Sequence, residues 1–147
     1  MRTRALVMAG VVALAVMSST RVAQAQEIMK VNIPFDFVAG NQLLPAGEYA
    51  VKLSGPQHSL LLIDRKYSLA SSFLNTNAVA ANEIQTESKL VFNRYGHRYF
   101  LSQIWTAGNS SGRQLQKSAR EKEVAQIAQV LTKDQVILVA ELPRTTP

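Results

Sequence analysis

The run LVFNRYGHRYFLSQIW constrains the fold more than any other part of the chain. Two segments rich in β-favouring residues, 89–95 and 98–106, flank the dipeptide Gly96-His97. Glycine adopts positive φ without a steric penalty, so it suits the first central position of a two-residue type II′ turn. We therefore predict a β-hairpin with two opposed pairs, Tyr95 with Arg98 and Phe92 with Leu101.

The second strand of this hairpin is apolar on both faces. Simple alternation places Phe100 and Ile104 on one face and puts three other large side chains on the opposite face: Tyr99, Leu101 and Trp105. A strand with two apolar faces is more often covered on both sides than half-solvated. We expect a further element of structure to cover the second face.

A helix beginning after Ser118 is the predicted cover. Ser118 and Glu121 have the spacing of a capping box, in which a hydroxyl and a carboxylate satisfy the first free amides of a helix. Apolar residues then recur at helical spacing, at positions Val124, Ile127, Ala128 and Leu131. We predict that this apolar stripe packs against the hairpin.

The rest of the chain after residue 25 reads mainly as strands and turns. Residues 30–38 alternate with period two, which indicates a half-buried strand, and Pro34 places it at a sheet edge or at a bulge. Pro45 and Gly47 predict a β-turn that leads into another strand. Further strands are predicted at residues 59–64, 68–74 and 135–142, the last largely buried. Loops are predicted at residues 75–87 and 108–117, with a short irregular strand within 75–87 as the alternative.

These elements predict a mainly β fold, either an antiparallel β-sandwich or a small barrel, with one α-helix in the C-terminal half packed on it. The predicted domain is single and spans residues 26–147, which is an ordinary domain size. The chain has no cysteine, so neither a disulfide nor a thiolate metal site can contribute.

Residues 1–25 have the pattern of a cleaved secretory signal peptide. Arg2 and Arg4 precede an uncharged apolar run over residues 5–17, and small residues occupy the positions before a predicted cleavage after Ala25. The apolar run is shorter than the roughly 20 residues that span a bilayer. We expect export to the periplasm or the outside of the cell, with no integral membrane segment after cleavage; an uncleaved anchor is the alternative.

The net charge of +6 does not indicate a nucleic-acid binder. Three of the sixteen basic residues lie in the predicted signal peptide, and the others are interspersed with acidic residues. Nucleic-acid-binding proteins usually concentrate lysine and arginine on one face. We therefore expect no nucleic-acid partner.

Two motifs together resemble a family of small exported uncharacterised bacterial proteins. The first is F-x-F-x-x-G-x-x-x-L-P-A-G-x-Y, carried here by Phe35, Phe37, Gly40, Leu44, Pro45, Ala46, Gly47 and Tyr49. The second is the Y-G-x-x-Y-F-L hairpin, carried by Tyr95, Gly96, Tyr99, Phe100 and Leu101. The resemblance implies export and a β-rich domain, and it brings no activity.

A looser likeness concerns the segment LPAGEYAV alone. It is similar to the turn and strand of carboxypeptidase-regulatory-like and prealbumin-like β-sandwich modules, which are non-catalytic. A likeness at this level concerns the fold, because function depends on a site and not on the fold.

The histidines do not form a predicted catalytic or metal site. His97 and His58 both lie in predicted turns, and a metal site needs several ligands that converge. We interpret both as exposed turn residues, and we expect no cofactor.

Arginine and aromatic side chains cluster on the predicted hairpin and form the candidate binding surface: Arg94, Tyr95, Arg98, Tyr99 and Trp105. Such side chains dominate binding hot spots, and arginine stacked on tyrosine would suit a sugar or an acidic polymer. The competing interpretation is that the aromatic residues are buried and the arginines cover them with their aliphatic stems.

The expected function is non-enzymatic binding or structural support in the envelope or outside the cell, with an envelope protein or a polysaccharide as partner. Two alternatives remain. A small barrel could carry an apolar ligand in a cavity lined by Phe35, Phe37, Tyr49 and Phe92. A hydrolase would need His97 or His58 within hydrogen-bond reach of a carboxylate and a hydroxyl.

Overall fold

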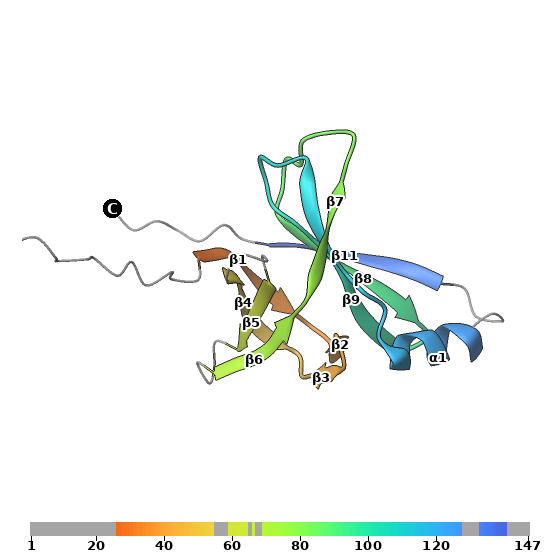
Figure 1. Ribbon diagram of the computed structural model, residues 1–147. Helices are drawn as coiled ribbons and strands as arrows, with labels where there is room; N and C mark the ends of the chain where they lie inside the picture. Colours follow the sequence, from red (N-terminus) through yellow and green to blue (C-terminus); the bar gives the residue numbers. More distant parts are fainter. Residues whose placement is uncertain (1–25, 55–58, 65, 67–68, 128–132, 141–147) are drawn as a thin grey trace, which may run out of the picture.

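The computed structural model describes residues 26–54, 59–64, 66, 69–127 and 133–140. This part of the chain is mainly β, with two sheets and one helix in the C-terminal half (Figure 1). The predicted fold class is confirmed. The sheets do not close into a barrel, so the barrel form of that prediction is not supported. The predicted signal peptide, His58 and the end of the last predicted strand lie outside the described residues.

The first sheet has four antiparallel strands in the order β1-β4-β5-β6. Their bounds are β1 Gln26–Ile33, β4 Gly47–Ser54, β5 Ser59–Asp64 and β6 Leu69–Leu74. Strand β1 ends directly before Pro34, which lacks the amide hydrogen needed to extend the ladder. The edge position predicted from Pro34 is confirmed, but the predicted strand over residues 30–38 is interrupted there and resumes as a separate strand.

The second sheet has seven strands, with β11-β8-β9-β10-β7 as its main path; β2 pairs in parallel with β9, and β3 pairs with β2. Their bounds are β2 Phe37–Ala39, β3 Gln42–Leu44, β7 Thr76–Ala80, β8 Lys89–Tyr95, β9 Arg98–Trp105, β10 Ser111–Leu115 and β11 Lys133–Val139. The segment from β6 to β7 crosses from the first sheet to the second with only Asn75 between the two strands (Figure 1).

The predicted hairpin is confirmed as β8 and β9, with both predicted pairs in register and Gly96 at φ 62°. A bulge at Ser102 then changes the alternation, because Phe92 pairs with Leu101 whereas Val91 pairs with Gln103. An extra residue in one strand reverses which side chains share a face.

The predicted division of β9 into two faces is therefore wrong beyond the bulge. Ile104 lies in the main core with Leu101, and Phe100 lies in a second cluster on the opposite face. Trp105 leaves the core face and packs over Gly112, where an added Cβ would come 2.7 Å from the indole ring.

One strand was predicted as a loop, and another lies where a loop was predicted with a short irregular strand as the alternative. Strand β10 lies within residues 108–117 and pairs with both β9 and β7, and β7 lies within residues 75–87. Glycine in a strand interior often marks close approach by another group, and Gly112 has this role beneath Trp105.

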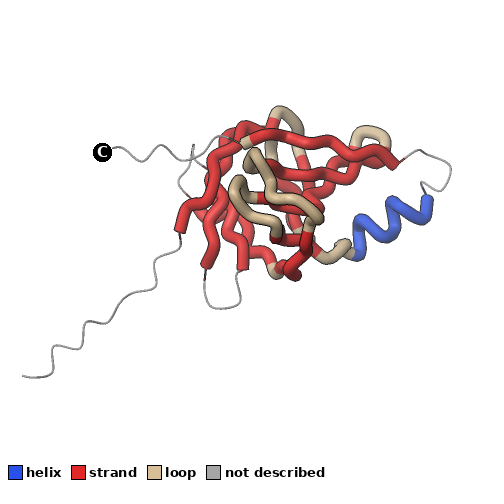
Figure 2. The backbone as a smooth tube through the Cα atoms, turned by 90° about the horizontal axis from the view of Figure 1, so that it is seen from above, coloured by secondary structure: helices blue, strands red, loops and turns tan. Residues whose placement is uncertain are grey.

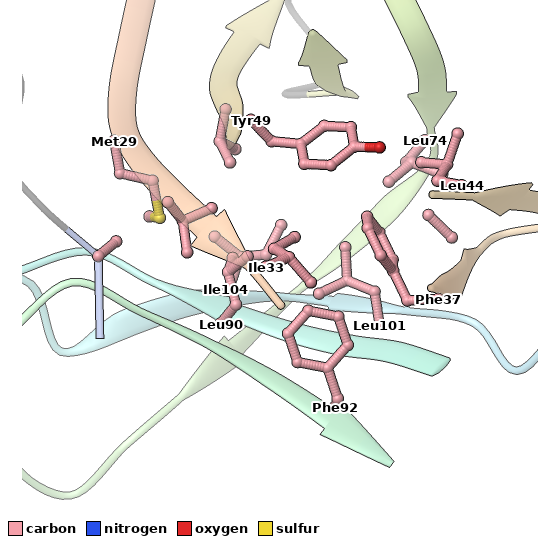
Figure 3. Packing of buried hydrophobic residues seen from close by; sticks show 14 of the residues in the cluster. Met29, Ile33, Phe37, Leu44, Tyr49, Leu74, Leu90, Phe92, Leu101 and Ile104 are labelled. Atoms are coloured by element: carbon pink, nitrogen blue, oxygen red, sulfur yellow. The ribbon is translucent and has the colours of Figure 1, made fainter. Parts of the chain in front are cut away.

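The main core fills the space between the two sheets (Figure 3). Met29, Ile33 and Tyr49 approach from the first sheet, and Phe92 and Leu101 approach from the second. Tyr49 donates a hydrogen bond from its hydroxyl to the carbonyl oxygen of Pro45 at 2.7 Å, so the phenol group holds the turn that precedes its own strand. A buried tyrosine usually finds such a partner for its polar end.

Helix α1, Ala119–Ile127, lies at one end of the molecule, beside the hairpin (Figure 2). Val124 and Ala125 pack against a small cluster of three buried residues on the outer face of the second sheet: Val38, Tyr95 and Phe100. The predicted packing of the helix on the hairpin is confirmed. The predicted stripe is wrong at Ile127, whose side chain is 79% exposed, and its last two members lie outside the described residues.

Strand β11 is an edge strand of the second sheet, and it is less buried than predicted. Val136 and Leu138 face the main core, whereas Ile137 and Val139 on the other face are 54% and 58% exposed. The apolar sequence of this strand predicts cover on both faces, but the helix reaches only the far end of the outer face. In the part of the chain that the structure describes, no helix has the length and apolar character needed to cross a membrane.

Candidate functional site

The predicted binding residues lie on both sides of the β8–β9 turn, and their side chains point to different faces of the sheet. Gly96 takes the positive φ, and His97 beside it is exposed. Beyond the turn, successive side chains alternate between the core face and the outer face of the sheet. The five predicted residues therefore do not form one surface.

Tyr95 and Trp105 belong to the buried interior, as the competing interpretation predicted. Their exposed fractions are 4% and 7%. Trp105 donates a hydrogen bond from Nε1 to Oε1 of Gln103 at 3.0 Å. Neither aromatic ring is available to a large ligand in this conformation.

A buried carboxylate holds the helix over Tyr95. Glu121 is 3% exposed, and its Oε1 accepts hydrogen bonds from Nδ2 of Asn93 at 2.8 Å and from the Tyr95 hydroxyl at 3.2 Å. Burial, followed by the nearby Glu121 charge and this hydrogen bond, raises the pKa of Tyr95. The backbone amide of Glu121 donates to Oγ of Ser118 at 3.1 Å, which confirms the predicted N-cap.

Sequence reasoning assigned Glu121 to the capping box but did not detect that its carboxylate is buried. No local signal distinguishes the two roles, because the partners Asn93 and Tyr95 are more than 25 residues away along the chain. The Glu121, Asn93 and Tyr95 side chains form what we call the helix tie.

Arg94 and Tyr99 are paired across the hairpin, and their side chains lie on the face of the sheet opposite to that of Tyr95. Arg94 forms an ion pair with Asp134, with 2.8 Å between Nη2 and Oδ2 and both side chains about half exposed. This hydrogen bond is the main cause that raises the pKa of Arg94. Tyr99 stacks on Phe35 with 3.8 Å between ring centroids. The charge of Arg94 is thus already neutralised by an acidic neighbour.

Arg98 and Tyr99 take part in a small groove at the end of the hairpin. The groove has a volume of about 280 Å³ and is formed by the region around β2 and β3, the hairpin turn and the start of α1. We call it the hairpin groove, and its lining residues are Asp36, Phe37, Val38, Leu43, His97, Arg98, Tyr99, Phe100 and Arg120.

The hairpin groove combines basic side chains with the exposed Leu43 and the half-buried Tyr99, and its other apolar lining residues are buried. Leu43 is 60% exposed beside the aromatic residues, and His97, Arg98 and Arg120 contribute imidazole and guanidinium groups. The one carboxylate in the lining belongs to Asp36, whose Oδ1 accepts the backbone N–H of Ala46 at 2.9 Å. Guanidinium groups bind carboxylates and phosphates through charge-assisted hydrogen bonds.

The groove residues Arg120, Leu43 and His97 were not predicted as binding residues. Arg120 stands directly beside the capping box, and a helix that packs on the hairpin must bring its first turn close to the hairpin end. That relation could have indicated Arg120, whereas the approach of Leu43 depends on the long-range pairing of β2 with β9.

The described residues include no group of three or more histidine, cysteine, aspartate or glutamate side chains able to hold a metal ion. His97 forms no hydrogen bond with a carboxylate or hydroxyl of another described residue. Its neighbours in the groove include Arg98 and Arg120. The groove brings two guanidinium groups and an imidazole together, an arrangement that can bind an anion.

Comparison of the chain with protein-family models gave no match, and neither the curated proteins nor the solved structures gave a similar protein. The two motifs that resemble a family of exported proteins therefore stay a prediction. Their residues have clear structural roles here: Gly96 forms the hairpin turn, and Tyr49 holds the turn at Pro45.

Proposed function

We propose that this protein is an exported, non-enzymatic β-domain that binds an acidic polysaccharide of the cell envelope or its surroundings through the hairpin groove. The observation that carries the proposal is the set of three basic side chains, His97, Arg98 and Arg120, beside the accessible apolar surface of Leu43 and Tyr99. Basic groups suit the carboxylates of acidic sugars, and the apolar lining suits the C–H faces of their rings.

The size of the groove fits one unit of a longer ligand. Sites for small molecules usually measure about 300–1,000 Å³, and the hairpin groove, at about 280 Å³, lies at the lower end of this scale. One charged sugar unit of a polymer needs less enclosed volume, because its neighbours extend into solvent.

The alternative of an apolar-ligand carrier has less support. The four side chains that would line its cavity contact one another, with centroid distances of 5.2 Å for Phe35–Phe92, 5.3 Å for Phe37–Tyr49 and 5.5 Å for Phe37–Phe92. Such edge-to-face contacts are typical of a filled core. The hydrolase alternative lacks a carboxylate or hydroxyl partner for His97 among the described residues.

Export is supported by the sequence pattern of residues 1–25. Expression of the full chain in a bacterial host, followed by cell fractionation and N-terminal sequencing, tests it. We expect the protein outside the cytoplasm with Gln26 as its first residue. An intact N-terminus in the cytoplasmic fraction would contradict export.

Binding is tested by calorimetric titration with hexagalacturonate, an acidic oligosaccharide, and with maltohexaose as the uncharged control. We expect hexagalacturonate to bind and the Arg98→Ala/Arg120→Ala variant to bind at least about tenfold more weakly, since a hydrogen bond to a charged group contributes about 1.5–3 kcal/mol. Lys122→Ala is the matched control, because Lys122 is an exposed cation of α1 outside the groove.

Two results would count against this ligand. Equal loss of affinity in the Lys122→Ala variant would indicate general charge attraction and not a site. Capture of an envelope protein by the purified domain, with no binding of the acidic oligosaccharide, would replace the polysaccharide by a protein partner.

A further inference from the structure

A second and larger cavity lies on the other side of the β2–β3 hairpin from the hairpin groove. Its volume is about 680 Å³, within the usual range for small-molecule sites. It is formed by the β2–β3 turn, the link between β6 and β7, and the link between β10 and α1. We call it the amide cavity, because of the side chains that line it.

Four exposed carboxamide side chains surround the cavity: Asn41, Gln42, Asn75 and Gln116. They come from three separate segments of the chain. None of these four side chains forms a hydrogen bond with another described residue, so their donors and acceptors are available to a ligand. Each carboxamide supplies two N–H donors and one carbonyl acceptor.

Buried apolar side chains lie behind these amides. Ala39, Leu74 and Leu115 line the cavity, and each belongs to the main core. Ala39, Leu74 and Leu115 are 0%, 4% and 5% exposed, so they close the cavity from the interior, and a ligand would meet mainly the exposed side chains at its edges. Ligand sites commonly combine apolar walls with a few polar groups that fix orientation.

The β2–β3 turn supplies a close-packed wall. Gly40 has φ 61°, and a Cβ added there would lie 3.1 Å from Cδ2 of Leu74. The turn therefore packs directly on the apolar lining, and its position is set by the fold before a ligand arrives. Such preorganisation lowers the cost of binding.

The charge of the cavity differs from that of the hairpin groove. No carboxylate lines it, and Lys117 is its one charged lining residue. A ligand with several negative charges would find one cation here, whereas a ligand rich in hydroxyl groups would find donors and acceptors from three segments of the chain. A pyranose sugar has this combination, with hydroxyls around its edge and C–H groups on its faces.

We propose that the amide cavity is a binding site for an uncharged sugar unit, held by the carboxamides of Asn41, Gln42, Asn75 and Gln116. This inference concerns a different surface and a different ligand charge from the hairpin groove, and it does not depend on the groove binding an anion. It gives the protein a second site for carbohydrate recognition.

The experiment is an NMR titration of ¹⁵N-labelled full-length protein with three neutral hexasaccharides: cellohexaose, maltohexaose and chitohexaose. Side-chain amide signals report the four carboxamides directly. At about 5 mM oligosaccharide, a millimolar Kd is detectable. We expect at least one hexasaccharide to shift the side-chain signals of the four cavity residues, and not that of Asn77, an exposed asparagine of β7 outside the cavity.

Two single variants test the same point by affinity. Asn75→Ala and Gln116→Ala should each weaken binding of the active hexasaccharide at least about threefold, and Asn77→Ala should leave it unchanged. Asn75 and Gln116 lie in separate segments, so a local folding defect in one variant would not explain weaker binding by both. Lack of any shift at the four side chains with all three sugars would overturn the proposal, as would equal weakening by Asn77→Ala.

The two proposals fail separately. If the amide cavity is a separate site, the Arg98→Ala/Arg120→Ala variant should lose hexagalacturonate binding and still bind the neutral hexasaccharide with unchanged affinity. A neutral sugar that shifts residues of the hairpin groove and not the amide cavity would contradict this inference alone.

Discussion

The two faces of the seven-stranded sheet are built differently. The inner face packs against the four-stranded sheet through a continuous apolar core (Figure 3). The outer face carries one short helix at one end, held by the polar helix tie, and elsewhere exposes Ile137 and Val139. We infer that the inner face supplies most of the stability, whereas the end of the outer face positions residues that bind.

The largest expected effect concerns the inner face. Phe92→Ala should lower the free energy of unfolding by about 3–5 kcal/mol, because it removes a fully buried ring that contacts Phe35 and Phe37. Urea denaturation monitored by Trp105 fluorescence measures the change. Ile137→Ala, an exposed position on the outer face, is the control; a similar loss there would remove the distinction between the two faces.

The helix tie should have the next largest effect. Glu121→Ala leaves the side chains of Asn93 and Tyr95 without their shared acceptor, and an unsatisfied buried polar group costs about 1–3 kcal/mol. We expect a loss of about 2–3 kcal/mol in the free energy of unfolding, with faster hydrogen exchange in α1 than in β8. Glu123→Ala, an exposed carboxylate on the same helix, should change neither quantity.

If hydrogen exchange in β8 rises as much as in α1, the helix is an integral part of the core and the comparison fails. The structure gives a reason to expect otherwise. Only two helix residues, Val124 and Ala125, pack on the outer cluster, so little apolar surface holds the helix once the carboxylate is gone.

A smaller effect is expected at the hairpin turn. Gly96→Val should destabilise the protein by about 1–2 kcal/mol, because a side chain disfavours the positive φ at this position. No atom lies within 4 Å of an added Cβ, so the cost comes from the backbone alone. Thermal unfolding measures it, with His97→Asn as the control; a large loss in the control would give His97 a structural role.

The smallest expected effect is a pH dependence. The folded protein raises the pKa of Tyr95, so this tyrosine contributes stability below its ordinary pKa of about 10 and loses that contribution as the pH rises through the higher value of the folded state. Tyr95→Phe should therefore lose less stability than the original protein above about pH 10. Denaturant titrations at several pH values measure the free energy of unfolding. The same decrease with pH in the Tyr95→Phe variant and in the original protein would contradict this prediction.

The strands and turns that depend on local pattern were predicted well. Alternation located β1 as far as Pro34 and, after the turn at Pro45, β4. Gly96 located the hairpin turn. Period two and positive φ are local properties. The helix start followed from Ser118 in the same way. These are the parts of the fold in which a few neighbouring residues decide the structure.

The parts that failed depend on distant contacts. The bulge at Ser102 reverses the faces of β9, and no residue type near it requires a bulge. Strand β10 contains Gly112 because Trp105 lies over it, so its sequence resembles a loop. The candidate site shows the same limit: Arg98 and Tyr99 were predicted, whereas the approach of Leu43 depends on the long-range pairing of β2 with β9.

The free energy of unfolding of the Arg98→Ala/Arg120→Ala variant tests the separation of stability from binding most directly. Both residues line the hairpin groove and lie at exposed positions, so we predict a change within about 1 kcal/mol of the original protein, together with the loss of acidic oligosaccharide binding. A decrease comparable to that of Phe92→Ala would contradict the account, because the groove would then be part of what holds the fold together.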